Sequence, residues 1–394
     1  MASNIKKVDN VRVDALNTFA KEFGDEATCC VCAPGRVNLI GEHTDYNEGF
    51  VLPMALPLVT VIAGKPNGTN KCVIISTNES ITTVSKIEFD VSNRESIKPG
   101  EPKWANYMKG CMVNFPVPIP GFNAVVVSSV PMGSGLSSSA ALEVATYTFL
   151  EALTGTEAKD PRDKALACQK AEHDFANVPC GIMDQFISVM GKEDHALLID
   201  CRDLSVTHVP MDQFHDHVFL ITNSNSPHKL STSAYRERRD ACFEAAQKLG
   251  KKSLRDVTLD EVETLKQQGA PQIMLKRVTH VINENARTLA ATSAFQSGDY
   301  TKVGQLMNES HDSLRDNYNV SSPELDALVN AARKVQGVRG SRLTGAGFGG
   351  CTITFVLKTA VDEVIKSINE SYSGKASFYI ATPSGGARKL DCKR

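Results

Sequence analysis

The chain has 394 residues, long enough for two domains and a large core. Hydrophobic residues make up 42% of it and charged residues 22%, a globular balance that argues against long disordered stretches. The 43 Lys and Arg residues nearly balance the 45 Asp and Glu residues, for a net charge of −2. Because there is no surplus of positive charge, we expect neither nucleic acid nor a membrane as a partner.

The eleven cysteines are an odd number scattered along the chain, which is typical of reduced, mostly buried cysteines in an intracellular protein. The first seven residues lack the apolar segment of a secretory signal. The longest apolar stretch, residues 50–64, contains two prolines and is shorter than the roughly 20 residues that a membrane span needs. We therefore expect a cytoplasmic location.

The first half of the sequence mixes helices and strands. Apolar residues at helical spacing predict a first helix that stops at Gly24. Short apolar or β-branched runs predict strands, and longer periodic runs predict helices. The strands are expected at 28–32, 72–76, 124–129, 195–200 and 218–224, and the helices at 138–153, 163–176 and 181–190. Residues 50–63 also look extended, and their prolines favour an edge strand or a broken strand.

The second half is mainly helical until its end. Periodic runs predict helices at 231–249, 274–296, 300–316 and 324–335. A strand at 351–357, a helix at 360–373 and a strand at 376–381 then close the chain. This ending suits a split βαβ, ferredoxin-like layer with helices on one face. We place the boundary between the two domains near residue 205, which gives domains 1–205 and 206–394.

A glycine- and serine-rich segment, residues 131–141, lies between a predicted strand and a predicted helix. Its glycines permit a close backbone approach, and the helix that follows offers unpaired N–H groups and the positive end of its dipole. This pattern predicts a phosphate-binding loop, and the alternative is a structural turn with a serine N-cap. The chain contains no Walker A motif and no protein-kinase H-R-D or D-F-G motif.

A second glycine-rich segment, residues 345–350, has the spacing G-x-G-x-x-G. A strand is predicted after it, whereas the dinucleotide-binding fingerprint requires a helix there. We interpret the segment as a flexible loop that closes over the first one, or as a tight structural turn.

Polar residues that suit the binding of hydroxyl groups crowd into residues 34–47. Arg36, Glu42, His43 and Asp45 lie there beside two glycines, and together they can accept and donate hydrogen bonds to a polyol. The alternative is a solvated charged turn. Asp184 lies in the first turn of another predicted helix, between apolar neighbours, where an acid can simply favour the helix dipole.

Together these segments resemble the three signature motifs of the GHMP small-molecule kinase superfamily. Residues 35–47, Gly-Arg-Val-Asn-Leu-Ile-Gly-Glu-His-Thr-Asp-Tyr-Asn, closely resemble the signature of its galactokinases, and further animal-type matches follow in order at 104–110, 180–190, 222–225 and 342–351. Ala346 replaces a glycine found in many relatives. The resemblance implies a two-domain α+β GHMP kinase fold with the active site between the domains. The N-terminal domain would be ribosomal S5 domain 2-like, and the C-terminal domain ferredoxin-like with extra helices.

The resemblance also implies a reaction: ATP phosphorylates the C1 hydroxyl of α-D-galactose, giving α-D-galactose 1-phosphate and ADP at the start of the Leloir pathway. Galactose and ATP would be the partners, Mg²⁺ the cofactor, and the protein a monomer or a weak dimer. The implied sugar-binding residues are Arg36, Glu42, His43, Asp45, Gly181, Asp184 and Tyr235. The implied ATP-binding residues are Gly133, Gly135, Ser137, Ser138 and Trp104. Ser139 and Glu172 are the implied Mg²⁺ ligands.

In this interpretation Asp184 accepts the proton of the C1 hydroxyl and Arg36 stabilises the transferring phosphoryl group. A dissociative transition state needs little base strength, so a purely positional role for Asp184 stays open. Two alternative functions also stay open: an N-acetylgalactosamine kinase, and a non-catalytic galactose sensor. Such sensors lose residues of the phosphate loop, so the intact Ser138-Ser139-Ala140 favours an enzyme.

Overall fold

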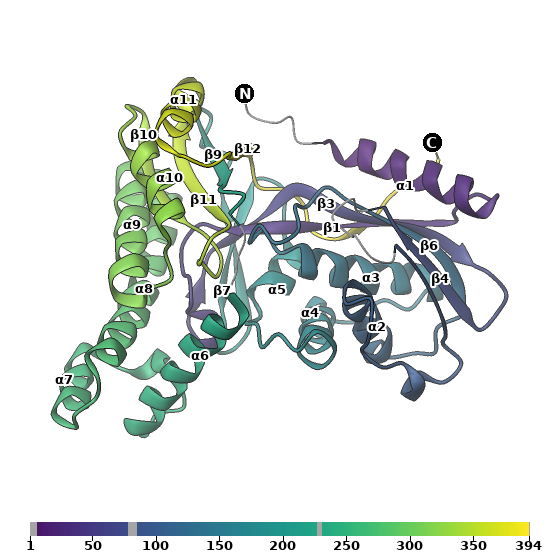
Figure 1. Ribbon diagram of the computed structural model, residues 1–394, viewed down its shortest axis with the longest axis horizontal. Coiled ribbons are helices and arrows are strands. Elements are labelled where there is room, and N and C mark those ends of the chain that lie inside the picture. Colours follow the sequence, from purple (N-terminus) through teal and green to yellow (C-terminus); the bar gives the residue numbers. More distant parts are fainter. Residues whose placement is uncertain (1–5, 78–84, 227–230, 394) are drawn as a thin grey trace.

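The computed structural model describes residues 6–77, 85–226 and 231–393. Residues 1–5, which contain most of the segment in which no secretory signal is predicted, lie outside them. A long sheet with its helices occupies one side of the molecule, and a second sheet surrounded by the C-terminal helices occupies the other (Figure 1). Among the described residues, no helix is long and apolar enough to cross a membrane.

The larger sheet contains both ends of the chain. Its strand order is β13-β1-β3-β6-β4-β5, and its neighbours are antiparallel except for the parallel pair β4 and β6. The strands are β1 (Cys29–Asn38), β3 (Pro53–Pro66), β4 (Lys71–Ser76), β5 (Lys86–Asp90), β6 (Phe122–Ser128) and β13 (Arg388–Lys389). Because β13 pairs with β1, the C-terminal residues return to the sheet that the N-terminal residues begin.

Alternate side chains of this sheet are buried by helices on opposite faces, as the period of two in a strand requires. Cys30 and Cys32 of β1 pack with α1 (Val8–Phe23). Val31 and Ala33 face the layer formed by α2 (Trp104–Asn114), α3 (Ser138–Thr154), α4 (Pro161–Ala171) and α5 (Met183–Met190). A separate three-stranded sheet, β2-β7-β8, consists of β2 (Phe50–Val51), β7 (His195–Asp200) and β8 (Ser205–Pro210).

The second sheet contains the predicted split βαβ unit. Its strand order is β10-β11-β9-β12, formed by β10 (Val338–Leu343), β11 (Cys351–Leu357), β9 (His217–Asn223) and β12 (Ser377–Ala381). Strands β11 and β12 both pair antiparallel with β9, and α11 (Val361–Ser371) connects them. The ferredoxin-like ending is therefore confirmed.

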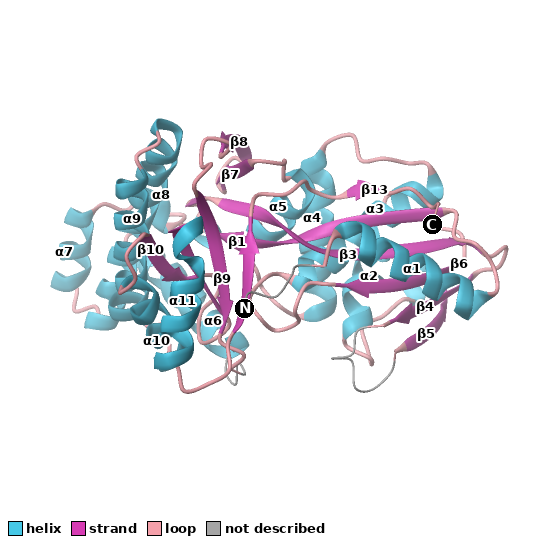
Figure 2. Cartoon of the chain, turned by 90° about the horizontal axis from the view of Figure 1, so that it is seen from above, coloured by secondary structure: helices cyan, strands magenta, loops and turns pink. Residues whose placement is uncertain are grey.

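The expectation of helices on only one face of this sheet is wrong. Val218 and Leu220 of β9 pack with α10 (Pro323–Arg333) and α11, whereas Phe219 and Ile221 pack with α8 (Gln272–Ser297) and α9 (Tyr300–Ser313). A strand covered on both faces has a continuous apolar sequence, and every residue of β9 is buried. Figure 2 shows these helices grouped around the second sheet. The helices α6 (Ser231–Lys248) and α7 (Leu259–Gln267) complete this half.

Residues 50–63 form a broken strand, as predicted, but not an edge strand. The break falls at Leu52, between β2 and β3, and β3 lies inside the sheet between β1 and β6. Pro53 is the first residue of β3, and Pro57 lies in a bulge of β3, where residues 56–58 face the single residue between Pro34 and Arg36 of β1. Both prolines therefore occupy places where an interior strand tolerates a missing N–H group.

Other differences concern ends and short elements. The helix predicted at 163–176 is α4 followed by a π-helical turn, Glu172–Ala176. A similar turn, Leu314–Tyr318, follows α9. The sequence patterns did not predict α2, α7, β5, β8 or β10.

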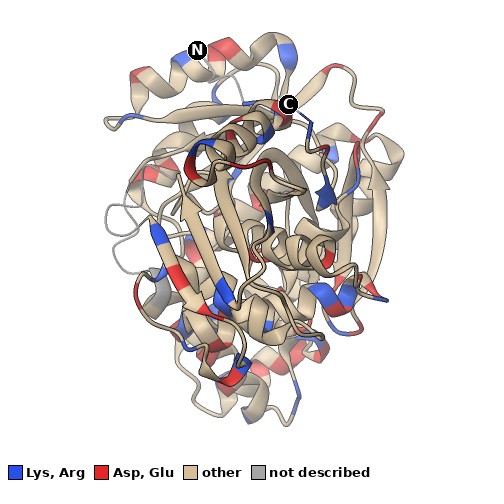
Figure 3. Cartoon of the chain, turned by 90° about the vertical axis from the view of Figure 1, so that its right-hand side faces the viewer, with Lys and Arg blue, Asp and Glu red and all other residues tan. Residues whose placement is uncertain are grey.

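The boundary near residue 205 stays a prediction, and β8 pairs with β7 across it. Charges of both signs are mixed over the side of the molecule shown in Figure 3.

Candidate active site

A cavity of about 200 Å³ lies where the two halves of the molecule meet. Every residue predicted for the sugar site lines it: Arg36, Glu42, His43, Asp45, Gly181, Asp184 and Tyr235. They come from the end of β1 and the turn after it, from the start of α5, and from α6. Gly345 and Ala346 of the second glycine-rich segment add a further wall, so that segment faces the cavity.

The floor of the cavity is an ion pair between Arg36 and Asp184. Nε and Nη2 of Arg36 donate to the two carboxylate oxygens of Asp184 at 2.7 and 2.9 Å. The side chain of Arg36 is 7% exposed and that of Asp184 is 22% exposed, so part of the carboxylate remains open to the cavity. A bidentate pair of this kind fixes both position and orientation.

Close packing at Gly35, where β1 faces the bulge of β3, brings Arg36 to the first glycine-rich loop. A Cβ on Gly35 would lie 2.5 Å from the carbonyl oxygen of Leu136, so only glycine allows this close approach. Nη1 of Arg36 donates to the carbonyl of Gly135 at 2.6 Å, and the hydroxyl of Ser137 donates to Asp184. The sugar-site residues and the phosphate-loop residues therefore meet at Asp184.

Asp45 packs directly against Gly181. A Cβ on Gly181 would lie 1.7 Å from Oδ2 of Asp45, and the backbone N–H of Tyr46 donates to Oδ1 at 2.9 Å. Burial, and secondarily the nearby Asp184, raise the pKa of Asp45 to about 7. Because this pKa lies near neutral pH, the carboxyl group of Asp45 can change its protonation state when a hydrogen-bonding group binds beside it.

His43 is held in a single neutral tautomer. Its Nε2 lies 3.1 Å from the carbonyl oxygen of Ala346, which can only accept, so Nε2 carries the proton. Nδ1 then accepts from the hydroxyl of Tyr46 at 2.7 Å, and the oxygen of Tyr46 accepts from Tyr318 at 2.8 Å. Burial, reinforced by the neighbouring His280, lowers the pKa of His43 to about 3. His43 is thus an uncharged link between the turn and the second glycine-rich segment.

A second cavity, of about 290 Å³, lies beside the start of α3. Trp104, Gly133, Ser138 and Ser139 line it, together with Tyr107. It contains some of the residues predicted for ATP. The remaining two, Gly135 and Ser137, contact Arg36 and Asp184 as described above. Since α3 begins at Ser138, its N-terminal N–H groups lie at this cavity, as a phosphate-binding loop requires.

The residues predicted to bind Mg²⁺ lie next to each other. The hydroxyl of Ser139 hydrogen-bonds Glu172, and Nε2 of Gln185 donates to Oε2 of Glu172 at 2.8 Å. Burial, and secondarily Asp184, raise the pKa of Glu172 to about 7. A divalent cation beside this carboxylate would favour its charged form. In the described part of the chain, no group of three or more His, Cys, Asp or Glu side chains forms a complete metal site. One carboxylate and one hydroxyl fit Mg²⁺, which usually relies on substrate phosphates and water for its other ligands.

Several residues that build the site were missed by the sequence analysis. They share a role in holding other residues of the site, and they are Tyr46, Gln185, Tyr318, Arg342 and Thr344. A partner that lies hundreds of residues away leaves no local pattern. The available signal for Tyr46 was its place inside the polar segment 34–47, and for Gln185, Arg342 and Thr344 it was their place inside the matched segments 180–190 and 342–351.

Three family models match the chain. The galactokinase galactose-binding signature matches residues 17–66, the N-terminal domain of GHMP kinases matches 106–192, and the C-terminal domain of GHMP kinases matches 291–374. The galactokinase of Canis lupus familiaris is 50% identical over 391 residues, covering 99% of each chain. The galactokinase of Homo sapiens is 50% identical over 389 residues, covering 98% of each chain.

Solved structures are similar as well. The galactokinase of Lactococcus lactis, determined in complex with galactose, aligns with a TM-score of 0.89 at 36% identity, covering 95% of this chain and 98% of that one. The mevalonate kinase of Methanococcus jannaschii aligns with a TM-score of 0.64 at 18% identity, covering 92% of this chain and all of that one. The second likeness concerns the fold alone.

Proposed function

Because the chain belongs to the galactokinase family of the GHMP kinases, we propose that its cavity binds galactose with the C1 hydroxyl directed at Asp184. The chain is a kinase that phosphorylates galactose with a nucleotide as the phosphoryl donor. The observation that carries the placement is the Arg36–Asp184 pair, which lies where the sugar cavity meets the phosphate loop.

The proposed chemistry is a direct transfer. The C1 hydroxyl donates its proton to Asp184 as its oxygen forms a bond to the γ-phosphorus, and the bond between that phosphorus and the leaving oxygen of ADP breaks. Arg36 spans Asp184 and Gly135, so its charge lies between the sugar and the phosphate loop. There it stabilises negative charge on the transferring group. The product is α-D-galactose 1-phosphate.

For the nucleotide, we propose that the phosphates lie at Gly133, Gly135, Ser137 and Ser138 and the adenine near Trp104. Ser139 and Glu172 would hold Mg²⁺, which neutralises charge on the β- and γ-phosphate oxygens when bound. Glu172 is close enough to Asp184 for their charges to interact, and Gln185 orients it, so its carboxylate is already held in this region.

Sugar selectivity tests the assignment of the cavity. A buried polar site rejects an analogue that misplaces a hydroxyl, because the site's own groups are then left unpaired. We expect the kcat/KM for glucose, which differs from galactose at C4, to be at least about 10³-fold lower than for galactose. ADP release with galactose, glucose and N-acetylgalactosamine measures this. Preference for N-acetylgalactosamine would assign the enzyme to that sugar, and ATP binding without turnover of any sugar would indicate a sensor.

The Mg²⁺ ligands are tested by the Glu172→Gln variant. Losing the carboxylate charge should raise the free Mg²⁺ concentration needed for half-maximal rate by about 10-fold or more, with the galactose KM unchanged. Glu157→Gln is the matched control, because Glu157 is an exposed carboxylate that pairs with Lys389 of β13. Rates measured across a Mg²⁺ titration decide the point, and an unchanged Mg²⁺ dependence would remove Glu172 from the metal site.

We also propose that the protein is a cytoplasmic monomer. All eleven cysteines are unpaired and most are buried, which suits a reducing compartment. The large apolar side chains that are exposed lie on several different elements, including Phe243 on α6, Leu289 on α8 and Ile380 on β12. Scattered exposure of this kind differs from the contiguous patch of a stable interface. Light scattering that gave twice the mass of one chain would contradict the monomer.

A further inference from the structure

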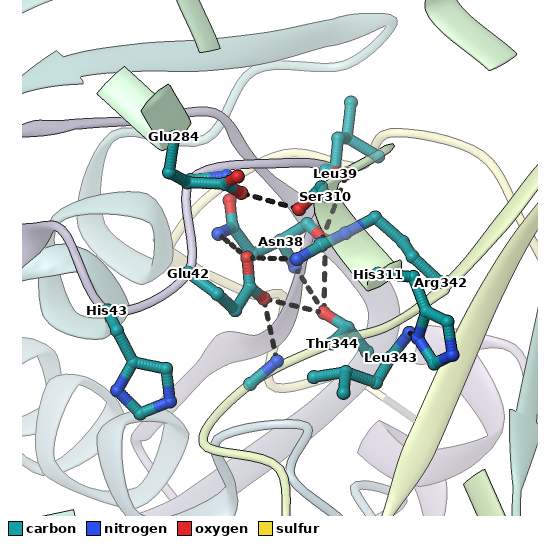
Figure 4. A network of polar contacts seen from close by, with 12 residues as sticks. Asn38, Leu39, Glu42, His43, Glu284, Ser310, His311, Arg342, Leu343 and Thr344 are labelled. Atoms are coloured by element: carbon teal, nitrogen blue, oxygen red, sulfur yellow. Dashed lines mark hydrogen bonds and ion pairs between the residues drawn. The ribbon is translucent and has the colours of Figure 1, made fainter. Parts of the chain in front are cut away.

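Arg342 is completely buried at the end of β10, between the second sheet and the turn that follows β1. Its Nη1 donates to the carbonyls of Asn38 and Leu39, each at 3.2 Å, and its Nη2 donates to Oε2 of Glu42 at 2.9 Å. Figure 4 shows the guanidinium reaching Glu42 and these backbone groups from the opposite side to His43. Arg342 does not line the cavity.

The carboxylate of Glu42 is bonded mainly within the protein. Oε2 accepts from Asn38 and Arg342, and Oε1 accepts from the backbone N–H of Gly345 at 2.7 Å and lies 3.3 Å from the hydroxyl of Thr344. A carboxylate has about four acceptor positions. Asn38, Arg342 and Gly345 fill three of them, and the single hydroxyl proton of Thr344 can go either to Oε1 or to the closer carbonyl of Asn38. Glu42 therefore lies at the cavity wall with most of its acceptor positions engaged in holding the protein together.

These contacts join the polar turn to the second glycine-rich segment at two successive positions. Glu42 binds the N–H of Gly345, and the next residue, His43, binds the carbonyl of Ala346. Thr344 adds a reciprocal pair with the backbone of Asn38: Asn38 N–H donates to its hydroxyl at 3.1 Å, and the hydroxyl lies 3.0 Å from the Asn38 carbonyl. Two walls of the cavity thus behave as one unit, and Arg342 is the cation at its centre.

We propose that Arg342 is a positioning residue for galactose. Through Glu42 and the carbonyls of Asn38 and Leu39, it fixes the turn that carries His43 and Asp45 against Gly345 and Ala346. The inference rests on the proposed sugar site. Arg342 contacts neither the phosphate loop nor the cavity of Trp104. Its replacement should therefore lower the affinity for galactose much more than the affinity for ATP.

The Arg342→Lys variant is the first test. Lysine keeps the charge but lacks the planar fork that serves a carboxylate and two carbonyls together. We expect the galactose dissociation constant, measured by calorimetry, to rise by about 10-fold or more, since small displacements of binding groups have effects of this size. ATP affinity, followed by the fluorescence of Trp104, the single tryptophan of the chain, should change less than about twofold. The matched control is Arg333→Lys.

Arg333 is a suitable control because it has the same kind of partners without touching the sugar site. It pairs with Asp312 at 3.0 Å and donates to the carbonyls of Asn308 and Ser341, and Ser341 is also in β10. Its replacement should leave galactose binding unchanged. Two results would overturn the proposal. One is a galactose dissociation constant for Arg342→Lys within twofold of that of the unmodified enzyme, and the other is an equal loss of affinity for galactose and for ATP.

A double variant separates positioning from stability. Arg342→Met alone leaves the buried charge of Glu42 unpaired and should lower the melting temperature, whereas combining it with Glu42→Gln removes both charges and should restore much of it. We expect galactose affinity to stay low in the double variant, because the forked contacts are still missing. Recovery of galactose affinity together with stability would show that the pair is only structural.

An Asp45→Ala variant distinguishes a failure of this inference from a failure of the proposed site. If Asp45→Ala weakens galactose binding and Arg342→Lys does not, the proposed sugar site is supported and the role of Arg342 is refuted. If neither variant weakens galactose binding, the sugar is bound elsewhere and both proposals are refuted.

Discussion

An enzyme carrying Asp184→Ala should lose phosphoryl transfer by about 10²–10⁴-fold, the range that a general base contributes, and should still fold and bind ATP. Asp184 is the cavity carboxylate that both Arg36 and Ser137 hold in place, and part of it remains exposed to the cavity. Its removal deprives the C1 hydroxyl of a proton acceptor at the junction with the phosphate loop. The single-turnover rate, measured by rapid quench at saturating galactose and ATP, reports the chemical step directly.

Asp184→Asn separates proton transfer from positioning. Asparagine can still accept a hydrogen bond from the sugar and from Arg36, but it cannot take up the proton. If Asp184 acts as a base, the Asn variant should be as slow as the Ala variant. If Asp184 mainly orients the sugar, the Asn variant should keep much of its rate. Asp174→Asn is the matched control, because Asp174 is an exposed acid paired with Lys170. Unmodified turnover by Asp184→Ala would refute both roles.

The second large effect is expected for Gly181→Ala. The added Cβ would lie 1.7 Å from Oδ2 and 2.1 Å from Cγ of Asp45, so the carboxylate must leave its present place. Asp45 is half-buried in the pocket wall and bonded to the backbone of Tyr46, which limits the room it has to move. We expect kcat/KM for galactose to fall by about 10²-fold, since a displacement of about 1 Å can cost that much.

Gly100→Ala is the control for this variant, because a Cβ at Gly100 meets nothing within 4 Å and its backbone lies outside the left-handed region. It should behave as the unmodified enzyme does. The KM for ATP should stay the same in both variants, since Asp45 lies on the sugar side of Asp184. Unchanged galactose kinetics in Gly181→Ala would mean that the contact between Gly181 and Asp45 does not shape the site.

In the structure, three side chains of one polar segment of the sequence have different chemical roles. Asp45 is a half-buried carboxyl with a raised pKa at the cavity, His43 is a neutral hydrogen-bonded link, and the carboxylate of Glu42 is bonded mainly to protein donors. All three were expected to bind sugar hydroxyl groups. We propose that Asp45 binds the sugar most directly, because Glu42 and both ring nitrogens of His43 already have partners.

The sequence by itself determined the features that depend on neighbouring residues. The glycine–serine loop between a strand and a helix follows from local turn preferences, and α3 begins at Ser138 as expected, although the hydroxyl of Ser137 binds Asp184 and does not cap the helix. The placement of Asp184 in the first turn of a helix and the closing split βαβ unit follow from periodicity. Even the break at Leu52 follows from local chemistry, since proline cannot donate to a ladder.

Only the tertiary structure decided which strands lie inside a sheet and which donors reach which acceptors. Strand β3 can lie inside the sheet because its prolines fall at its first residue and in its bulge opposite Gly35, and the pairing that produces this bulge is not visible within residues 50–63. Arg342 pairs with Glu42 across 300 residues of chain. Whether Glu42 faces a substrate or the protein depends on how its acceptor positions are filled, and groups brought together by folding fill them.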